Sequence, residues 1–159
     1  MPTILSEDFN TNDGGWSANA DAQSFSYIPV SGADGGYVEG VDRTSGDVWY
    51  FVGGLPFTGD LSEFAGGTLE YSLRQASATS QFDDVDVIIV GADRSIGFDF
   101  PLDQNPGEDW TAYNINLTGA AGWFDLTTDA VLSDAEIAAV LGDVQSLQIR
   151  GEYRTGSDS

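Results

Sequence analysis

The stretch Gly66–Leu73, with the sequence GGTLEYSL, decides the fold class of this 159-residue chain. After the two glycines, Leu69, Tyr71 and Leu73 alternate with polar residues. A period of two places these three side chains on one face of an extended strand and the polar ones on the other. The pattern therefore predicts a strand whose sheet has one buried face and one solvated face.

The same alternation recurs on both sides of this stretch. It predicts strands around Val85–Ile89, Ile96–Phe100, Tyr113–Leu117 and Leu147–Ile149, and shorter ones at Ser24–Ile28, Tyr37–Val41 and Val48–Val52. Most of the 20 glycines lie between these segments, where they allow tight turns. We therefore predict an all-β fold, a two-sheet antiparallel jelly-roll sandwich. An immunoglobulin-type sandwich is the alternative, but its usual Cys…Trp…Cys spacing is absent.

One helix interrupts the strand pattern. Ser133 and Glu136 have the spacing of a capping box, in which each side chain bonds the backbone N–H of the other residue. Ile137 and Leu141 then fall on one face of a helix, four residues apart. The sequence therefore predicts one short helix near residues 133–141.

The charge of the chain excludes several functions. It has 26 acidic residues and five basic ones, a formal net charge of −21, and such a surface repels nucleic acid and anionic lipid. No apolar run approaches the ~20 residues needed to span a bilayer. Cysteine and histidine are absent, which rules out disulfides, Cys/His zinc sites and Ser-His-Asp or Cys-His catalysis. Paired carboxylates arise by chance among so many acids, so we expect no enzyme.

Several motifs frame the central stretch in a definite order. They are Trp49-Tyr50-Phe51, Pro56-Phe57 and Gly59-Asp60-Leu61-Ser62 before it, and Trp110-Thr111-Ala112-Tyr113, Gly122-Trp123 and Leu147–Tyr153 after it. Together with Phe9 and Gly15-Trp16 they resemble the laminin IV (laminin B) domain over nearly the whole chain. The resemblance implies a galactose-binding-like jelly roll, here a bacterial member of the family. It provides no catalytic residues.

The resemblance also implies how the domain is organised. We expect residues 1–159 to form a single laminin-IV-like β-sandwich domain, cut from a longer exported protein and located outside the cell or at its surface. Family members usually continue past Leu147–Tyr153 with one more short strand that closes the domain. We therefore expect this chain to lack a final strand, which would leave an unpaired sheet edge.

Two functions are open to such a module, which we expect to be monomeric. The first is carbohydrate binding, specifically of a polysaccharide, and the alternative is an architectural or adhesive contact with an extracellular protein. A sugar site needs an exposed aromatic platform beside planar polar groups. We predict Trp16, Tyr50, Arg74, Trp123, Arg150 and Glu152 as ligand-binding residues, and consider Trp49, Trp110 and Tyr153 as further aromatic candidates. A flat polar face with an open sheet edge would instead favour the protein contact.

The excess of acid also suits calcium, which takes 6–8 oxygen ligands in irregular arrangements. Jelly rolls of this superfamily often hold a structural calcium ion near the first strand and the loop that follows it. At that place the chain offers Glu7, Asp8, Asn10 and Asp13, which we predict as the calcium ligands. The segment Asp83–Asp86 is a second candidate.

Overall fold

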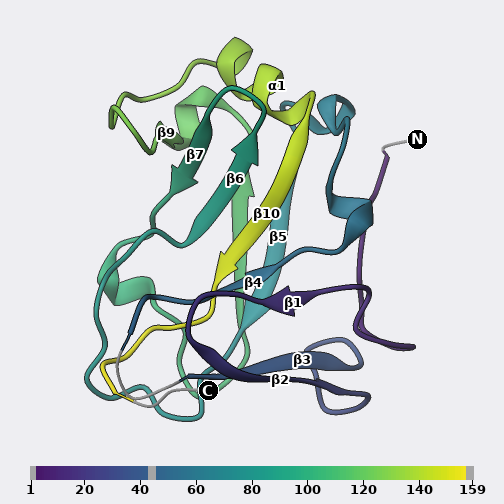
Figure 1. Ribbon diagram of the computed structural model, residues 1–159, viewed down its shortest axis with the longest axis vertical. Coiled ribbons are helices and arrows are strands. Elements are labelled where there is room, and N and C mark those ends of the chain that lie inside the picture. The colour runs from purple at the N-terminus through teal and green to yellow at the C-terminus, as the bar shows by residue number, and fades with distance from the viewer. Residues whose placement is uncertain (1–2, 43–45, 157–159) are drawn as a thin grey trace.

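The larger β-layer is a six-stranded antiparallel sheet, counted over residues 3–42 and 46–156, which the computed structural model describes. Its order is β1-β4-β10-β6-β7-β9, so strands distant in sequence lie side by side (Figure 1). The strands are β1 (Ser17–Ala18), β4 (Tyr50–Val52), β6 (Val87–Gly91), β7 (Ser95–Phe98), β9 (Phe124–Asp125) and β10 (Val144–Arg150). The last long strand, β10, thus occupies the middle of the sheet between β4 and β6.

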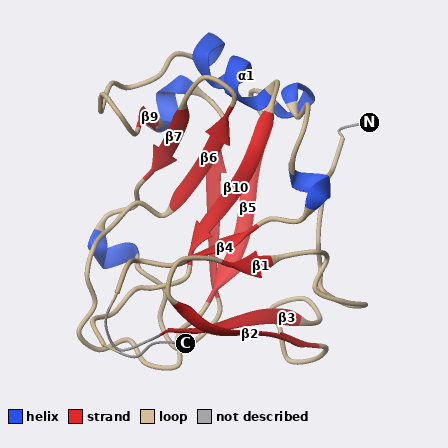
Figure 2. Ribbon diagram, viewed as in Figure 1, coloured by secondary structure: helices blue, strands red, loops and turns tan. Residues whose placement is uncertain are grey.

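Two further antiparallel pairs of strands lie outside the larger sheet. One pair joins β2 (Ala22–Ile28) to β3 (Tyr37–Asp42), and the other joins β5 (Thr68–Leu73) to β8 (Thr111–Asn116). In Figure 2, β5 lies behind β10, while β2 and β3 lie below the larger sheet. The predicted all-β, two-layer antiparallel sandwich is confirmed. The absence of a closing strand stays a prediction.

The single α-helix of the described residues, α1 (Asp134–Leu141), lies where the capping box predicted it. The Ser133 hydroxyl accepts a hydrogen bond from the Glu136 backbone N–H at 3.2 Å, and the Glu136 carboxylate accepts one from the Ser133 N–H at 3.3 Å. Four short 3₁₀ helices lie elsewhere in this part of the chain, at Leu55–Phe57, Ser62–Phe64, Leu102–Gln104 and Gly119–Ala121. None of these helices is long and apolar enough to cross a membrane.

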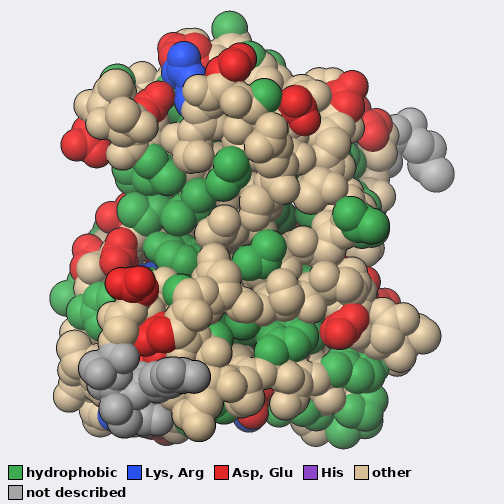
Figure 3. All heavy atoms as spheres, in the orientation of Figure 1, with side chains coloured by type: hydrophobic (Ala, Val, Ile, Leu, Met, Phe, Trp, Pro, Cys, Tyr) green, Lys and Arg blue, Asp and Glu red, His purple; other side chains and the backbone are tan. Residues whose placement is uncertain are grey.

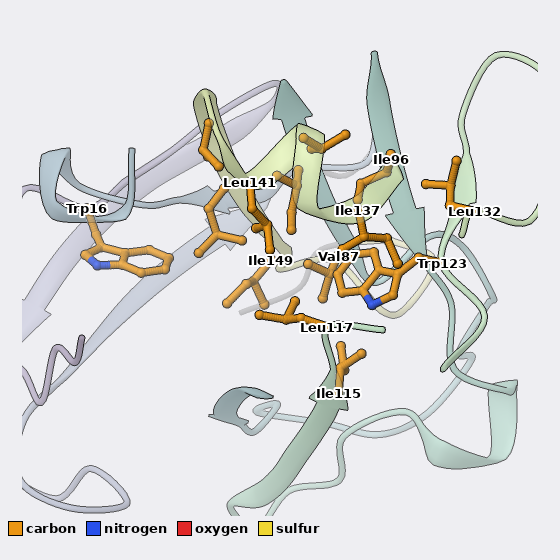
Figure 4. Close-up of a cluster of buried hydrophobic side chains, with 14 residues drawn as sticks. Trp16, Val87, Ile96, Ile115, Leu117, Trp123, Leu132, Ile137, Leu141 and Ile149 are labelled. Carbon is orange, nitrogen blue, oxygen red and sulfur yellow. The ribbon is translucent and has the colours of Figure 1, made fainter. Parts of the chain in front are cut away.

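The hydrophobic core lies between the two layers and under α1 (Figure 4). The alternating residues predicted to face inward supply most of it: Val87, Ile89, Ile96, Ile115, Leu117, Leu147 and Ile149 are all buried. Trp123 sits at its centre with none of its surface exposed. In contrast, Leu69, Tyr71 and Leu73 of β5 are only partly buried. The inner face of β5 therefore faces something other than a closed core.

Candidate functional site

A groove with a volume of about 1270 Å³ explains the exposure of β5. It is lined by the N-terminal segment Thr3–Phe9 and by β5, which are well separated in Figure 1. Its apolar lining includes Phe51, Phe57, Leu69, Tyr71 and Ile149. Because this groove reaches the core, apolar side chains from both layers contact solvent there.

Strand β5 presents an unpaired backbone edge beside this groove. Among the described residues, β5 pairs only with β8, and Leu117 donates its N–H to the Gly67 carbonyl at 2.9 Å at the start of that ladder. In an antiparallel ladder only every second residue bonds to a given neighbour. The N–H and C=O groups of Thr68, Glu70 and Ser72 therefore point away from β8. An unpaired edge of this kind is a template for another strand.

The N-terminal segment Thr3–Phe9 also lies outside the strand ladders of the described residues. Its side chains nevertheless alternate in burial, with Leu5, Glu7 and Phe9 partly buried and Ser6 and Asp8 exposed. This alternation is typical of a strand that packs one face on a core. The groove is thus bordered by two stretches whose residues alternate in burial like those of strands.

Acidic side chains surround the groove. Glu7, Asp8, Asp34, Glu39, Glu63 and Glu70 contribute to its lining. Figure 3 shows the same imbalance on the face in view, where acidic side chains are scattered widely and basic ones are few. The electrostatic potential along the groove therefore favours a cationic occupant.

An aromatic and cationic cluster also contributes to the lining of the groove. The Arg74 guanidinium carbon lies 5.4 Å from the centre of the Trp110 ring and 5.9 Å from that of the Tyr37 ring. The two rings meet edge to face at 5.4 Å, and the Trp110 indole N–H donates to the Ser31 carbonyl at 3.3 Å. Arg74 is exposed and both rings are half-buried, so this cluster is accessible to a ligand.

Arg74 is the one predicted ligand-binding residue that the structure exposes. The other five, Trp16, Tyr50, Trp123, Arg150 and Glu152, are all at least nine-tenths buried. The Trp123 indole N–H donates to the Asn116 carbonyl at 2.9 Å, and the Tyr50 hydroxyl donates to the Val85 carbonyl at 2.8 Å. These side chains pack mainly inside the domain, although Trp16 and Arg150 also contribute to the lining of the groove. The structure thus brings Trp16, Arg74 and Arg150 to the groove, but not Tyr50, Trp123 and Glu152.

The predicted calcium ligands are engaged in local turns. Glu7 accepts from the Phe9 N–H at 2.8 Å, and Asp13 accepts from the Gly15 N–H at 3.0 Å. Asp8 accepts from the backbone N–H and the side-chain amide of Asn10, and these bonds lower the pKa of Asp8. Within the described part of the chain, the carboxylates of Glu7, Asp8 and Asp13 do not form a group of converging ligand atoms. Calcium binding by them stays a prediction.

The second acidic candidate is also divided by the fold. Asp84 accepts a hydrogen bond from the N–H of Val85 at 2.7 Å. Asp86 instead turns into the interior and forms an ion pair with Arg150. Among the described residues, the carboxylates of Asp83, Asp84 and Asp86 do not converge as a group of metal-ligand atoms.

Three other carboxylates do converge. Asp21 precedes β2, Asp42 ends β3 and Glu152 follows β10, and one oxygen from each lies within 4.8 Å of the other two. The pairing of Ala22 with Asp42 across the β2–β3 ladder brings the first two together. Sequence inspection missed this group, because Glu152 lies more than 100 positions from its two partners. A local cluster was the only kind that spacing could indicate.

Burial and mutual repulsion change the acidity of this group. Asp42 is 2% exposed and Glu152 is 9% exposed. Burial, the charge of Asp42, a side-chain hydrogen bond with Asp42 and the charge of Asp21 together raise the pKa of Glu152 to about 7. The Glu152 carboxylate also accepts a hydrogen bond from the backbone N–H of Trp49, and the Trp49 ring packs directly on Gly151.

Comparisons with known proteins agree with this architecture. The family model described as Laminin B (Domain IV) matches residues 50–159. Among solved structures, the L4b domain of human laminin alpha-2 is similar with a TM-score of 0.62, at 14% identity, over 90% of this chain and 92% of that one. At so low an identity, this similarity shows the fold alone. No curated protein sequence matches the chain significantly.

Proposed function

This chain belongs to the laminin B (domain IV) family, and we propose that it is an extracellular, adhesive protein-contact module whose contact surface is the groove between Thr3–Phe9 and β5. The domain acts there without catalysis, by adding an extended segment of a partner protein to the open edge of β5. The observation that carries this proposal is the unpaired backbone of β5 beside an apolar groove. In strand addition, main-chain hydrogen bonds supply affinity and alternate side chains supply specificity.

The lining of the groove defines the chemistry of this partner. An added strand would direct every second side chain toward Leu69, Tyr71 and the neighbouring apolar residues, so those positions must be apolar. Acidic residues such as Glu63 and Glu70 are exposed near the groove, so Lys or Arg at the ends of the strand would be attracted. The partner segment is therefore extended, apolar at alternate positions and basic at its ends.

A proline at Ser72 tests the strand addition directly. Its N–H points away from β8, so Ser72→Pro removes a donor that the β5–β8 ladder does not use, and proline is tolerated at such edge positions. Ser72→Ala keeps the N–H and is the matched control. The probe is a Lys-flanked hexapeptide with valine at alternate positions, labelled for fluorescence anisotropy, beside a peptide of the same composition without the alternation.

We expect the alternating peptide to bind the parent domain and Ser72→Ala, and to bind Ser72→Pro at least tenfold more weakly. Hydrogen exchange should show the amides of Thr68, Glu70 and Ser72 protected by the peptide. Equal binding to both variants, or to the non-alternating peptide, would contradict strand addition. If a longer form of the protein protects these amides by itself, the groove holds a strand of its own chain and the partner proposal fails.

A second function is favoured by the cluster of Arg74, Trp110 and Tyr37. An accessible aromatic pair beside an arginine, at a groove lined with carboxylates, has the groups that orient a sugar. A glycan array with the parent domain and Trp110→Ala tests it. A polysaccharide signal that Trp110→Ala abolishes supports carbohydrate binding at this cluster. An array without a signal, or one unchanged in Trp110→Ala, argues against it.

A further inference from the structure

Independently of the groove, we propose that Asp21, Asp42 and Glu152 bind one calcium ion and thereby tie the β2–β3 hairpin to the end of β10. The three residues lie directly before β2, at the end of β3 and just after β10. An ion held between them would join the two layers of the sandwich at one edge.

The spacing of the three oxygens suits a calcium ion. Calcium lies 2.3–2.6 Å from its oxygen ligands, so two ligands of the same ion are at most about 5 Å apart. One oxygen from each of the three side chains lies within 4.8 Å of the other two. A single ion can therefore contact all three without a large movement of the backbone.

Unsatisfied buried oxygens point to the same ligand. Glu152 is about nine-tenths buried, and its Oε2 atom makes no hydrogen bond among the described residues. Both carboxylate oxygens of Asp21 are likewise buried there without a hydrogen bond. No ion pair in the described residues joins an arginine to Asp21 or Glu152. Buried carboxylates are costly unless they are paired or coordinate a metal, so a cation would satisfy these atoms.

The donor set distinguishes calcium from other metals. All three ligands are carboxylates, and the chain has no histidine or cysteine to favour zinc. Magnesium demands a nearly ideal octahedron, whereas calcium accepts an irregular group of oxygens completed by water.

The neighbouring Trp49 provides a specific probe. Terbium occupies calcium sites and emits when it is excited through a nearby tryptophan. Because the backbone N–H of Trp49 donates to the Glu152 carboxylate, an ion on Glu152 lies close to this residue. We expect terbium to emit under tryptophan excitation, and calcium to displace it while magnesium at the same concentration does not. Thermal unfolding should occur about 5 °C or more higher at a hundredfold excess of calcium over Kd than in chelator.

Two variants place the site, and a third controls for charge. Glu152→Gln and Asp21→Asn each remove one ligand, whereas Asp8→Asn removes one charge from the predicted N-terminal site. In chelator, Glu152→Gln should unfold at a higher temperature than the parent, because one repelling charge is gone. In calcium the order should reverse, because the parent alone keeps the complete site. The unfolding temperature of Asp8→Asn should rise with calcium by as much as that of the parent.

The outcomes are distinct. The site is refuted if calcium does not raise the unfolding temperature of the parent. It is also refuted if magnesium or 0.5 M salt removes the terbium signal, because that would indicate ions held only by the surface charge. If the rise in unfolding temperature with calcium is lost in Asp8→Asn but kept in Asp21→Asn, the ion binds at the N-terminal cluster and not at Asp21, Asp42 and Glu152. A Glu152→Gln variant that is more stable in both chelator and calcium shows that the carboxyl groups share a proton and hold no metal. Peptide binding to Ser72→Ala is unaffected by any of these results, so the two proposals fail separately.

Discussion

Arg150 Nη2 lies 3.2 Å from Asp86 Oδ1 inside the domain, where the two side chains are 0% and 3% exposed. Arg150 also donates to Asn105 Oδ1 at 2.9 Å, and its guanidinium carbon lies 3.9 Å from the centre of the Tyr153 ring. This buried pair links β10 to the segment before β6. Burial raises the pKa of Asp86, and the Arg150 charge opposes that rise. Arg150, one of the predicted ligand-binding residues, therefore has a structural role in the domain.

Breaking this pair should be strongly destabilising. Asp86→Ala leaves the Arg150 charge buried without its partner, which costs about 3–5 kcal/mol in the free energy of unfolding. Urea denaturation followed by tryptophan fluorescence measures the loss. Arg94→Ala, at an exposed ion pair with Glu136, is the control and should change little. The double variant Arg150→Met, Asp86→Leu should recover much of the stability, and a double variant as unstable as Asp86→Ala would contradict this account.

Trp123 should behave as a core residue. It has no exposed surface and packs on Phe98 with ring centres 5.4 Å apart, so Trp123→Ala should lower the free energy of unfolding by about 3–5 kcal/mol. Trp110→Ala, at a half-buried ring, should cost clearly less. Thermal unfolding of both variants makes the comparison. Equal losses would contradict the difference in packing that the structure shows.

The N-terminal cap of α1 should contribute measurably to the stability of the domain. Ser133→Ala removes the acceptor for the Glu136 N–H and should cost about 1 kcal/mol. Ser133→Asp keeps a side-chain acceptor at the same position and should lose little. Chemical denaturation of the two variants separates the effect of the cap from that of losing the hydroxyl. If the hydroxyl alone mattered, Ser133→Ala and Ser133→Asp would have the same free energy of unfolding.

Gly151 should not tolerate a side chain. A methyl group there would collide with the buried Trp49 ring, so Gly151→Ala should destabilise the domain by about 1–3 kcal/mol through overpacking. Gly107→Ala is the matched control, since no atom lies within 4 Å of the position of its added methyl group. If the melting temperatures of the two variants fall by the same amount, this result would argue against the contact between Trp49 and Gly151.

Without added cation, stability should fall as the pH rises through neutrality. The folded state raises the pKa of Glu152 from 4.5 to about 7, so it binds this proton more tightly than the unfolded chain does. The resulting stabilisation is complete below about pH 4.5 and is lost as the pH rises through about 7. Asp21 and Asp42, which face Glu152, cause part of the shift.

Urea denaturation in chelator at pH 5 and pH 8 measures this effect. Burial also raises the pKa of Asp99 to about 6, and that group contributes in the same direction. The parent and Glu152→Gln both contain Asp99, so the difference between their pH dependences gives the contribution of Glu152 alone. A parent no more sensitive to pH than Glu152→Gln would show that Glu152 does not titrate in this range.

Local sequence patterns were enough to predict the longer strands and the helix. Alternation in Leu69–Leu73, Val85–Ile89 and Tyr113–Leu117 and the capping box at Ser133 are local patterns, and local backbone geometry is set by neighbouring residues. The strands β1 and β9 escaped prediction, because two residues are too few to show a period. Composition alone also excludes thiol and histidine chemistry, because the chain contains neither cysteine nor histidine.

Which side chains meet depends instead on the tertiary structure. Burial of Trp123 and Arg150 depends on which face of each segment turns inward, and alternation leaves that choice open where both faces carry large side chains. The register of β2 with β3 set Asp21 beside Asp42, and the path of β10 carried Glu152 to them. Contacts across more than 100 residues depend on strand order and register, which no local pattern encodes.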